Sequence, residues 1–337
     1  MDDPLRHHGD VEARGAELDF AVNVYAGPRP PWLDAALHAS LEDVDAYPSA
    51  DRARAAVAAH HRRTEDGVLV TAGAAEAFTL IARLRPWRRP VVVHPQFTEP
   101  HAALEQAGHR VTSVVLPPPF ELDPGLVEEL VPEDADLVII GNPTNPTGVL
   151  HPAEVLRSLR RPGRVVVVDE AFMDCDPDET ESLAGDRCPG LVVIRSLTKH
   201  WGIPGIRAGY LVGDAMVVAG LALNQTPWSV GTTAAAAVIA CTSPEAAEEA
   251  RRRAIEIRDW REHLEKGLAD LGVDHLPSAA SFVLAQVGAG VRERLRADGI
   301  AVRRADSFPG LDDTWVRIAV RPRELTDQLL AALSRLA

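Results

Sequence analysis

The chain has 337 residues, of which 46% are hydrophobic and 25% are charged, and its formal net charge at pH 7 is −14. This length is enough for one large domain with a smaller one beside it, and the acidic balance argues against a nucleic-acid partner, because such a chain repels phosphate backbones. No apolar run approaches the ~18 residues needed to cross a bilayer, and the N-terminal residues lack the apolar core of a secretory signal. We therefore expect a cytoplasmic protein with no membrane partner.

The cysteines and histidines show no disulfide or metal-binding pattern. Cys175, Cys188 and Cys241 are too few and too scattered for a disulfide framework or a C-x-x-C site. His60 and His61 are adjacent and lack the spacing of metal ligands. We expect reduced thiols and no bound metal.

In chain order, the first 40 residues predict an N-terminal arm, because the Pro-rich segment 27–32 is typical of irregular chain. Short β-branched runs then alternate with amphipathic stretches. The expected strands are 68–70, 91–94, 111–116, 136–140, 165–169, 191–194 and 207–213, and the expected helices include 75–84, 99–107 and 152–160. Apolar strands separated by helices predict a mostly parallel sheet buried between helical layers, an α/β architecture.

The pattern changes after about residue 231. A long helix is expected over 243–271, followed by a strand at 281–286, a helix at 290–298, a strand at 315–320 and a helix at 324–336. This order predicts a smaller α+β domain. We divide the chain into an arm (1–40) that packs with the small domain, a large domain (41–235) and a small C-terminal domain (236–337).

Polar residues that carry chemistry follow several of the expected strands, where open α/β sheets bind ligands. In SLTKHWGIPGIR (196–207), Lys199 directly follows a strand, and its amine can form an imine with an aldehyde cofactor. Ser196, Thr198 and Arg207 are placed to clamp a phosphate. A structural role for this segment is the alternative.

Asp169 ends a strand of four consecutive valines, so its carboxylate is expected at the mouth of the sheet. A carboxylate in that position needs a partner, and a protonated pyridine nitrogen is suitable. The alternative is an aspartate that caps the following turn.

Three further segments have both a functional and a structural interpretation. In GNPTNPTG (141–148), Asn145 has an amide to offer a phenolate oxygen, although the segment alone is an ordinary turn. In TAGAAEAF (71–78), Gly73, Ala74 and Ala75 leave backbone N–H groups open to a phosphate at the start of a helix, or simply make a tight turn. Phe97 either stacks on a flat ring or belongs to the core.

The order of these features along the chain resembles the fold type I pyridoxal-phosphate enzymes, the family that includes the aspartate aminotransferases. The resemblance covers essentially the whole chain. It implies pyridoxal 5'-phosphate as cofactor, held as a Schiff base on Lys199, with a large domain and a smaller α+β domain. No G-x-G-x-x-G or P-loop motif competes for a nucleotide.

Within that family the chain is similar to the histidinol-phosphate aminotransferases and threonine-phosphate decarboxylases, through AYPSAD (46–51), DEAFMD (169–174), RSLTK (195–199), PWSV (227–230) and SFPGLDDTWVRIAVR (307–321). The resemblance implies a homodimer in which Tyr47 reaches the cofactor phosphate of the neighbouring subunit. It implies that Arg317 grips the substrate α-carboxylate. Arg303, expected in a loop before the last strand, and His8 are the implied anchors for the substrate's phosphate.

Two positions depart from the family pattern. The N-x-N-P start of the arm reads Asn23-Val24-Tyr25-Ala26 here, and we retain Asn23 as a substrate-binding candidate. The tyrosine that follows Asp-Glu-Ala in the aminotransferases is Phe172 here, as in the decarboxylases, and a phenyl ring cannot donate a hydrogen bond.

The expected reaction is decarboxylation of L-threonine O-3-phosphate to aminopropanol phosphate, so the expected partner is a small phosphorylated amino acid. The first alternative is an aminotransferase of the histidinol-phosphate or aromatic type. A second, less favoured alternative is a non-catalytic regulator that binds pyridoxal phosphate.

Overall fold

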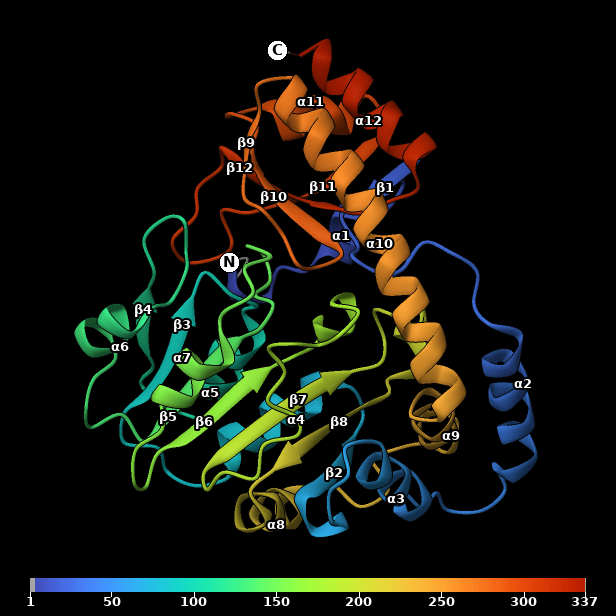
Figure 1. Cartoon of the computed structure of the whole chain (residues 1–337), viewed down its shortest axis with the longest axis vertical. Coiled ribbons are helices and arrows are strands. Elements are labelled where there is room, and N and C mark those ends of the chain that lie inside the picture. The colour runs from blue at the N-terminus through green and yellow to red at the C-terminus, as the bar shows by residue number, and fades with distance from the viewer. Residues whose placement is uncertain (1–3, 337) are drawn as a thin grey trace.

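The computed structural model describes residues 4–336, which form two lobes joined by one long helix (Figure 1). The larger lobe contains a seven-stranded sheet. Its strands, in spatial order, are β2 (Val68–Thr71), β8 (Gly209–Gly213), β7 (Leu191–Ser196), β6 (Val165–Asp169), β5 (Leu137–Gly141), β3 (Pro90–His94) and β4 (Thr112–Val115). Strand β8 is antiparallel to both neighbours, and the pairings from β7 to β4 are all parallel.

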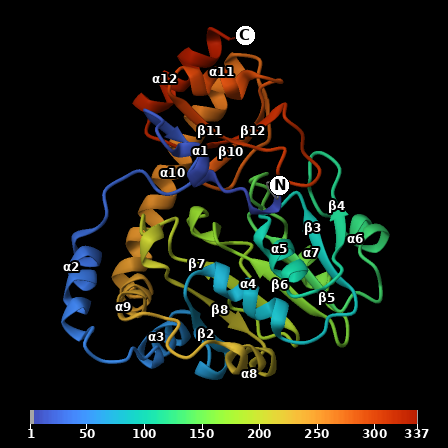
Figure 2. The ribbon, with the colours of Figure 1, turned by 180° about the vertical axis from the view of Figure 1, so that it is seen from behind.

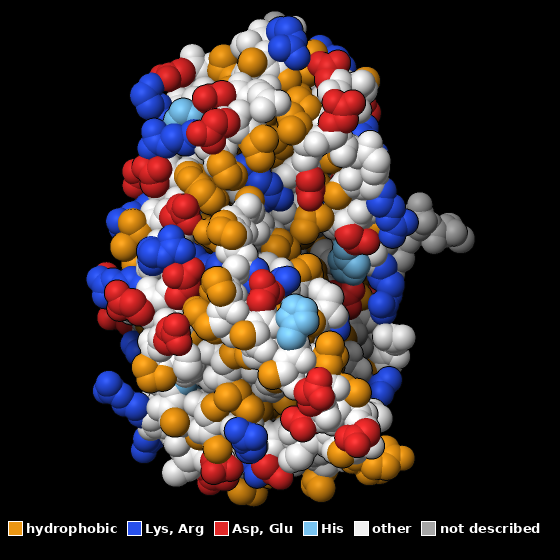
Figure 3. Space-filling model, turned by 90° about the vertical axis from the view of Figure 1, so that its right-hand side faces the viewer, with side chains coloured by type: hydrophobic (Ala, Val, Ile, Leu, Met, Phe, Trp, Pro, Cys, Tyr) orange, Lys and Arg blue, Asp and Glu red, His pale blue; other side chains and the backbone are white. Residues whose placement is uncertain are grey.

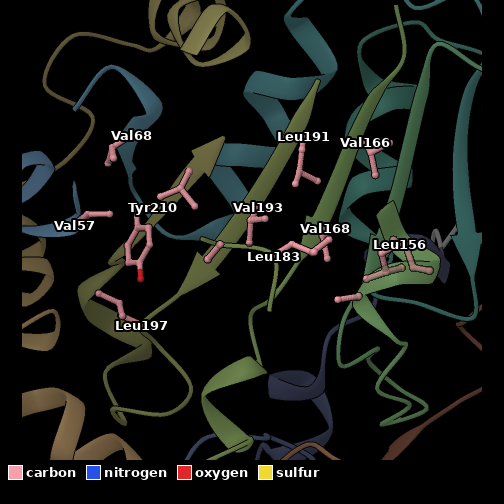
Figure 4. Packing of buried hydrophobic residues seen from close by; sticks show 14 of the residues in the cluster. Val57, Val68, Leu156, Val166, Val168, Leu183, Leu191, Val193, Leu197 and Tyr210 are labelled. Atoms are coloured by element: carbon pink, nitrogen blue, oxygen red, sulfur yellow. The ribbon is translucent and has the colours of Figure 1, made fainter. Parts of the chain in front are cut away.

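Helices cover both faces of this sheet, as near-continuous apolar strands require. One face packs on α4 (Ala74–Arg83), α5 (Glu99–Gln106) and α8 (Ala215–Asn224). The other packs on α2 (Pro31–Ala39), α3 (Asp51–His60), α6 (Pro124–Leu130), α7 (Ala153–Ser158) and α9 (Thr232–Cys241). Figure 4 shows part of this second core, in which Val168, Val193 and Tyr210 project from neighbouring strands. The expected α/β architecture is confirmed.

The smaller lobe is built on a five-stranded sheet. The strands, in spatial order, are β1 (Leu18–Phe20), β11 (Ile300–Arg304), β12 (Trp315–Ala319), β10 (Phe282–Gln286) and β9 (Asp274–His275). Helices α11 (Val291–Ala297) and α12 (Arg323–Ser334) pack with it, and short α1 (Gly9–Ala13) contacts β11. Figure 2 shows β1 and α1 beside the C-terminal elements, far from them in sequence.

Helix α10 (Pro244–Asp270) has 27 residues and runs from one lobe to the other (Figure 1). Ser243 caps its first turn, where the hydroxyl oxygen accepts a hydrogen bond from Ala246 N at 3.1 Å. At ~1.5 Å per residue the helix is about 40 Å long. It therefore forms a continuous connection between the two sheets.

The N-terminal 40 residues differ in two ways from the expected irregular arm. Residues 18–20 form β1, which pairs in parallel with β11 of the small domain. Pro31 begins helix α2, because proline is well suited to the first helical position. Leu33 and Leu37, one turn apart, bury in the core of the large domain, so this part of the arm packs there. The predicted division at residue 235 falls inside α9.

The surface contains charges of both signs. On the face seen in Figure 3, acidic and basic side chains are interspersed with scattered hydrophobic ones, without a basic stripe. Within residues 4–336, no helix is both long and apolar enough to cross a membrane. The same residues contain no group of three or more side chains arranged to hold a metal ion.

Candidate active site

A cavity of about 630 Å³ lies at the carboxyl ends of the central strands, below the small domain. Two lining residues are the last residues of neighbouring strands, Asp169 of β6 and Ser196 of β7. Thirteen of the candidate residues line this one cavity, namely His8, Asn23, Ala74, Ala75, Phe97, Asn145, Asp169, Ser196, Thr198, Lys199, Arg207, Arg303 and Arg317. The fold thus brings together side chains that span nearly the whole chain.

Lys199 follows β7, and its backbone carbonyl accepts a hydrogen bond from Tyr25 N at 3.0 Å. Burial lowers the pKa of its amine to about 8, with further lowering by Arg317 and Arg207 and an opposing effect of Asp169. A lysine with this pKa is partly neutral near pH 7.5 to 8. A neutral amine is the form that attacks a carbonyl carbon.

Asp169 is buried, and its Oδ1 accepts a hydrogen bond from Ala171 N at 3.2 Å. Burial raises the pKa of this carboxyl to about 7, while the bond from Ala171 lowers it and the neighbouring Glu170 raises it further. Among residues 4–336, no cation lies within ion-pair distance of Asp169. A cationic ring nitrogen at this position would supply the missing partner.

One end of the cavity gathers hydroxyl, guanidinium and backbone N–H groups, whose chemistry would suit a phosphate. The hydroxyl oxygens of Ser196 and Thr198 are 2.9 Å apart. Arg207, in the left-handed region at φ 58°, donates to Pro204 O at 2.8 Å. Gly73 has φ 77°, and a Cβ there would lie 2.7 Å from Arg207 Nη2. No side chain caps α4, so its first backbone N–H groups are open to an anion.

Arg317 and Arg303 lie directly opposite each other on β12 and β11, and both line the cavity. Arg317 donates to Asn145 Oδ1 at 2.7 Å and to Ala21 O at 2.6 Å, and its Nε has no hydrogen-bond partner. Arg303 donates to His7 O and to Ser307 Oγ, each at 2.7 Å. The expectation that Arg303 lies in a loop is wrong, because residues 300–304 form a buried strand.

Residues Arg317 and Arg303 are 4% and 2% exposed, and neither guanidinium group has a carboxylate within 4.0 Å in the described part of the chain. Burial lowers the pKa of Arg303 to about 10, and burial with the nearby Arg303 and Arg321 lowers the pKa of Arg317 to about 9. Buried charges are ordinarily paired. The cavity therefore favours an anionic ligand at each arginine.

The start of the chain closes one side of the cavity. His8 Nε2 lies 2.8 Å from Glu99 Oε1, and its ring is 5.9 Å from that of Phe97. Asn23 is buried, and its Nδ2 has no hydrogen-bond partner. Glu99 was not identified as a site residue from the sequence, although it begins α5 two residues after Phe97.

Tyr47 does not line this cavity. Its side chain is 79% exposed and stacks on Trp228, with ring centroids 4.5 Å apart. Trp228 is itself 61% exposed. Phe172 does line the cavity and packs edge-on against Phe282 at 4.9 Å.

The residues present fit pyridoxal phosphate. The lysine amine suits the aldehyde, Asp169 suits the ring nitrogen, and the cradle around Gly73 and Arg207 suits the phosphate. The aromatic and apolar walls, Phe97 and Ala171, suit a flat ring.

Comparisons with known proteins agree with this geometry. Residues 16–333 match the family model for class I and II aminotransferases. A histidinol-phosphate aminotransferase of Mycobacterium tuberculosis is 47% identical over 322 residues, covering 94% of this chain and 87% of that protein. The threonine-phosphate decarboxylase of Salmonella typhimurium is 31% identical, covering 94% and 90% of the two chains.

Solved structures show the same fold. The histidinol-phosphate aminotransferase of Clostridium acetobutylicum superimposes with a TM-score of 0.87 at 26% identity, over 95% of this chain and 98% of that one. The L-threonine-O-3-phosphate decarboxylase of Porphyromonas gingivalis gives a TM-score of 0.81 at 25% identity, over 94% and 98%. The chain therefore belongs to the class I and II aminotransferase family, and it is a pyridoxal-phosphate enzyme of fold type I.

Proposed function

We propose that the protein is an aminotransferase that exchanges the amino group of a small phosphorylated amine, of the histidinol-phosphate type, with a 2-oxo acid. The relatives at 47% identity favour transamination over the decarboxylation expected from the sequence. A non-catalytic regulator has no support among the enzymes named above.

The structural observation that supports a phosphorylated substrate is the pair Arg303 and Arg317, directly opposite across two strands and both buried without a carboxylate partner in the described residues. The choice of transamination rests on the relatives at 47% identity. An aminotransferase receives two substrates in turn at one site. The 2-oxo acid presents a carboxylate to Arg317, and the amine presents a phosphate to Arg303. Charge-assisted hydrogen bonds of this kind contribute about 1.5–3 kcal/mol each.

In this proposal the bound cofactor withdraws electrons from the substrate carbon that carries the nitrogen. Asp169 holds the proton on the ring nitrogen, which keeps the ring a strong electron acceptor. With the cofactor bound, Lys199 Nζ would take the proton from the substrate carbon that carries the nitrogen and would donate it to the cofactor carbon on the other side of that nitrogen, and a pKa of about 8 suits both transfers near neutral pH. Asn145, held by Arg317, orients its amide toward the cavity.

Decarboxylation of threonine phosphate is the second candidate. Threonine phosphate carries both anions in one molecule, so it would occupy both arginines together. Phe172, which has no hydroxyl group, matches the decarboxylase pattern stated above, and a decarboxylase is among the relatives. In this reaction Arg317 would hold the carboxylate so that its bond to Cα breaks.

A product assay separates the two candidates. The purified protein is incubated with histidinol phosphate or threonine phosphate, each with and without 2-oxoglutarate, and glutamate and carbon dioxide are measured. Glutamate formed only with histidinol phosphate and 2-oxoglutarate supports transamination. Carbon dioxide released from threonine phosphate without 2-oxoglutarate would overturn it in favour of the decarboxylase.

We also propose that two copies of the chain share their sites, with Tyr47 reaching the cofactor phosphate of the neighbouring subunit. The support is an exposed apolar surface around Tyr47 that includes Leu41, Val44 and Trp228, each more than half exposed. Such a patch on an otherwise mixed surface is typical of an interface. Dimer formation, with weakened cofactor binding in Tyr47→Phe, is the expected result.

A further inference from the structure

The ends of β6 and β7 present different chemistry on their two faces. Along a strand, successive side chains face opposite sides of the sheet. Asp169 and Ser196 line the cavity. Their neighbours Glu170 and Arg195 do not, and Arg195 pairs across β7 and β8 with Tyr210, which belongs to the core on the opposite face (Figure 4).

Glu170 and Arg195 form the centre of a buried ionic cluster on that opposite face. Arg195 Nε lies 3.0 Å from Glu170 Oε2, and the two side chains are 3% and 0% exposed. Ser182 Oγ joins them, donating to Glu170 Oε2 at 2.7 Å and accepting from Arg195 Nη2 at 3.0 Å. Leu183 N donates to Glu170 Oε1 at 2.6 Å.

Two further carboxylates and a pair of neighbouring histidines surround this ion pair. Asp174 Oδ1 lies 3.3 Å from Arg195 Nη1, and Glu179 Oε1 accepts from the same nitrogen at 3.0 Å. His61 Nε2 lies 2.9 Å from the Tyr210 hydroxyl, and His60 lies beside His61 with ring centroids 4.7 Å apart. Three carboxylates therefore share one guanidinium group. Arg195 and Glu170 have almost no access to water, whereas the Glu179 side chain is 35% exposed.

We propose that Glu170 and Arg195 are positioning residues, whose ion pair joins the carboxyl ends of β6 and β7 and so holds Asp169 and Ser196 in place on the cofactor side. In their proposed roles, Asp169 and Ser196 would contact opposite ends of one rigid ligand, the ring nitrogen and the phosphate. A sideways movement of one strand end would spoil one contact while keeping the other. Misplacement by about 1 Å can cost on the order of 100-fold in rate.

The cluster also acts on the charge of the site. Glu170 raises the pKa of the Asp169 carboxyl, because a negative charge nearby disfavours ionisation. The other charged or titratable groups around the pair are Asp174, Glu179, His60, His61 and Tyr210, and they belong to the opposite face. Removal of the negative charge of Glu170 is therefore expected to lower the pKa of Asp169 and of any group of the bound cofactor that titrates beside it.

The test is the variant Glu170→Gln, which retains a side chain of the same shape but removes its negative charge. We expect kcat to fall about tenfold or more, with KM changed less than about threefold, because positioning acts on the chemical step. The pH at which the absorption band of the bound cofactor titrates should move down. Cofactor affinity, measured by fluorescence titration of the cofactor-free protein, should also weaken.

The matched control is Asp186→Asn, which removes a bidentate ion pair with Arg157 at 2.6 and 3.2 Å elsewhere in the same domain. It should leave kcat, the absorption titration and the cofactor affinity unchanged. If Glu170→Gln behaves like this control, the proposal is overturned and the cluster is merely structural. Ser182→Ala removes only the bridging hydroxyl and should show the same changes at a smaller size. It replaces Glu170→Gln as the test variant if Glu170→Gln fails to fold.

This inference rests on the proposed roles of Asp169 and Ser196, and Asp169→Asn separates the two failures. If Asp169→Asn loses activity while Glu170→Gln does not, only the positioning role is wrong. If Asp169→Asn is also fully active, the proposed role of Asp169 itself fails.

Discussion

The two halves of the cavity are built differently. The half proposed to hold the cofactor, called the cofactor half, consists of residues that end or directly follow strands of one sheet, such as Asp169 and Ser196. The half proposed to hold the substrate, called the substrate half, is assembled from the small domain and from the start of the chain, through Arg303, His7 and Arg317. The first half depends on one rigid sheet, whereas the second depends on how two lobes and an N-terminal segment meet. Substitutions in the two halves should therefore fail in different ways.

The largest effect is expected from Lys199→Ala. Because one specific amine must bind the cofactor covalently and move the proton, turnover should fall on the order of 10⁴-fold. Borohydride treatment followed by mass measurement should find no cofactor attached to the protein. A remaining adduct would identify another lysine as the anchor.

Asp169→Asn should lose about 100- to 1,000-fold in kcat, because the ring nitrogen is no longer held protonated. Cofactor should still bind, since the phosphate cradle is intact. Steady-state kinetics and cofactor content measured on the same sample check this. Near-normal activity would remove Asp169 from the mechanism.

The substrate half should respond selectively to the anion. Arg303→Ala should raise the apparent dissociation constant of a phosphorylated substrate about 10- to 100-fold and leave unphosphorylated ligands almost unchanged. Arg317→Ala should weaken every ligand that carries a carboxylate. Titration with phosphorylated and unphosphorylated ligand pairs tests both. If Arg303→Ala weakens binding of phosphorylated and unphosphorylated ligands equally, another residue binds the phosphate, and His8 is the next candidate.

The pH dependence of the cofactor-free protein probes Lys199 alone. Burial lowers the pKa of this amine to about 8. The rate at which it reacts with an amine-selective reagent should therefore rise about tenfold per pH unit below pH 8 and level off above pH 8. The rate is read by peptide mapping at residue 199. A rise that continues toward pH 10 would show that the amine is not perturbed.

The smallest effect is expected at the interface. Tyr47→Phe should weaken cofactor binding about fivefold, the contribution of one hydrogen bond of ~1 kcal/mol. In mixed dimers that also carry Lys199→Ala in one subunit, the defect should appear in the site opposite the altered tyrosine. Unchanged affinity in a chain shown to be monomeric would exclude the shared site.

The cofactor half was easier to predict from the sequence than the substrate half. The strand ends were predictable, because four valines before Asp169 or a glycine before α4 specify local structure that sequence patterns report. The strand position of Arg303 was not, because strand β11 is recognisable only through its pairing with β1 and β12. Glu99 was expected at the start of a helix, as observed, but its contact with His8 depends on how the N-terminal segment folds back. Helix α2 was missed since prolines signal both irregular chain and a first helical turn. The substrate was the least predictable feature, because two arginines fit either one doubly charged molecule or two molecules in turn.

Strand β1 has a consequence for synthesis of the protein. Leu18 pairs with Ile300, so the strand at the start of the chain receives its neighbour only when nearly all of the chain has been made. At translation rates of about 5–20 residues per second, this interval lasts roughly 15–60 s. During that time Phe20, almost fully buried in the finished protein, has no core to enter. The nascent N-terminal segment therefore lacks both its strand partner and its core until synthesis of the small domain is nearly finished.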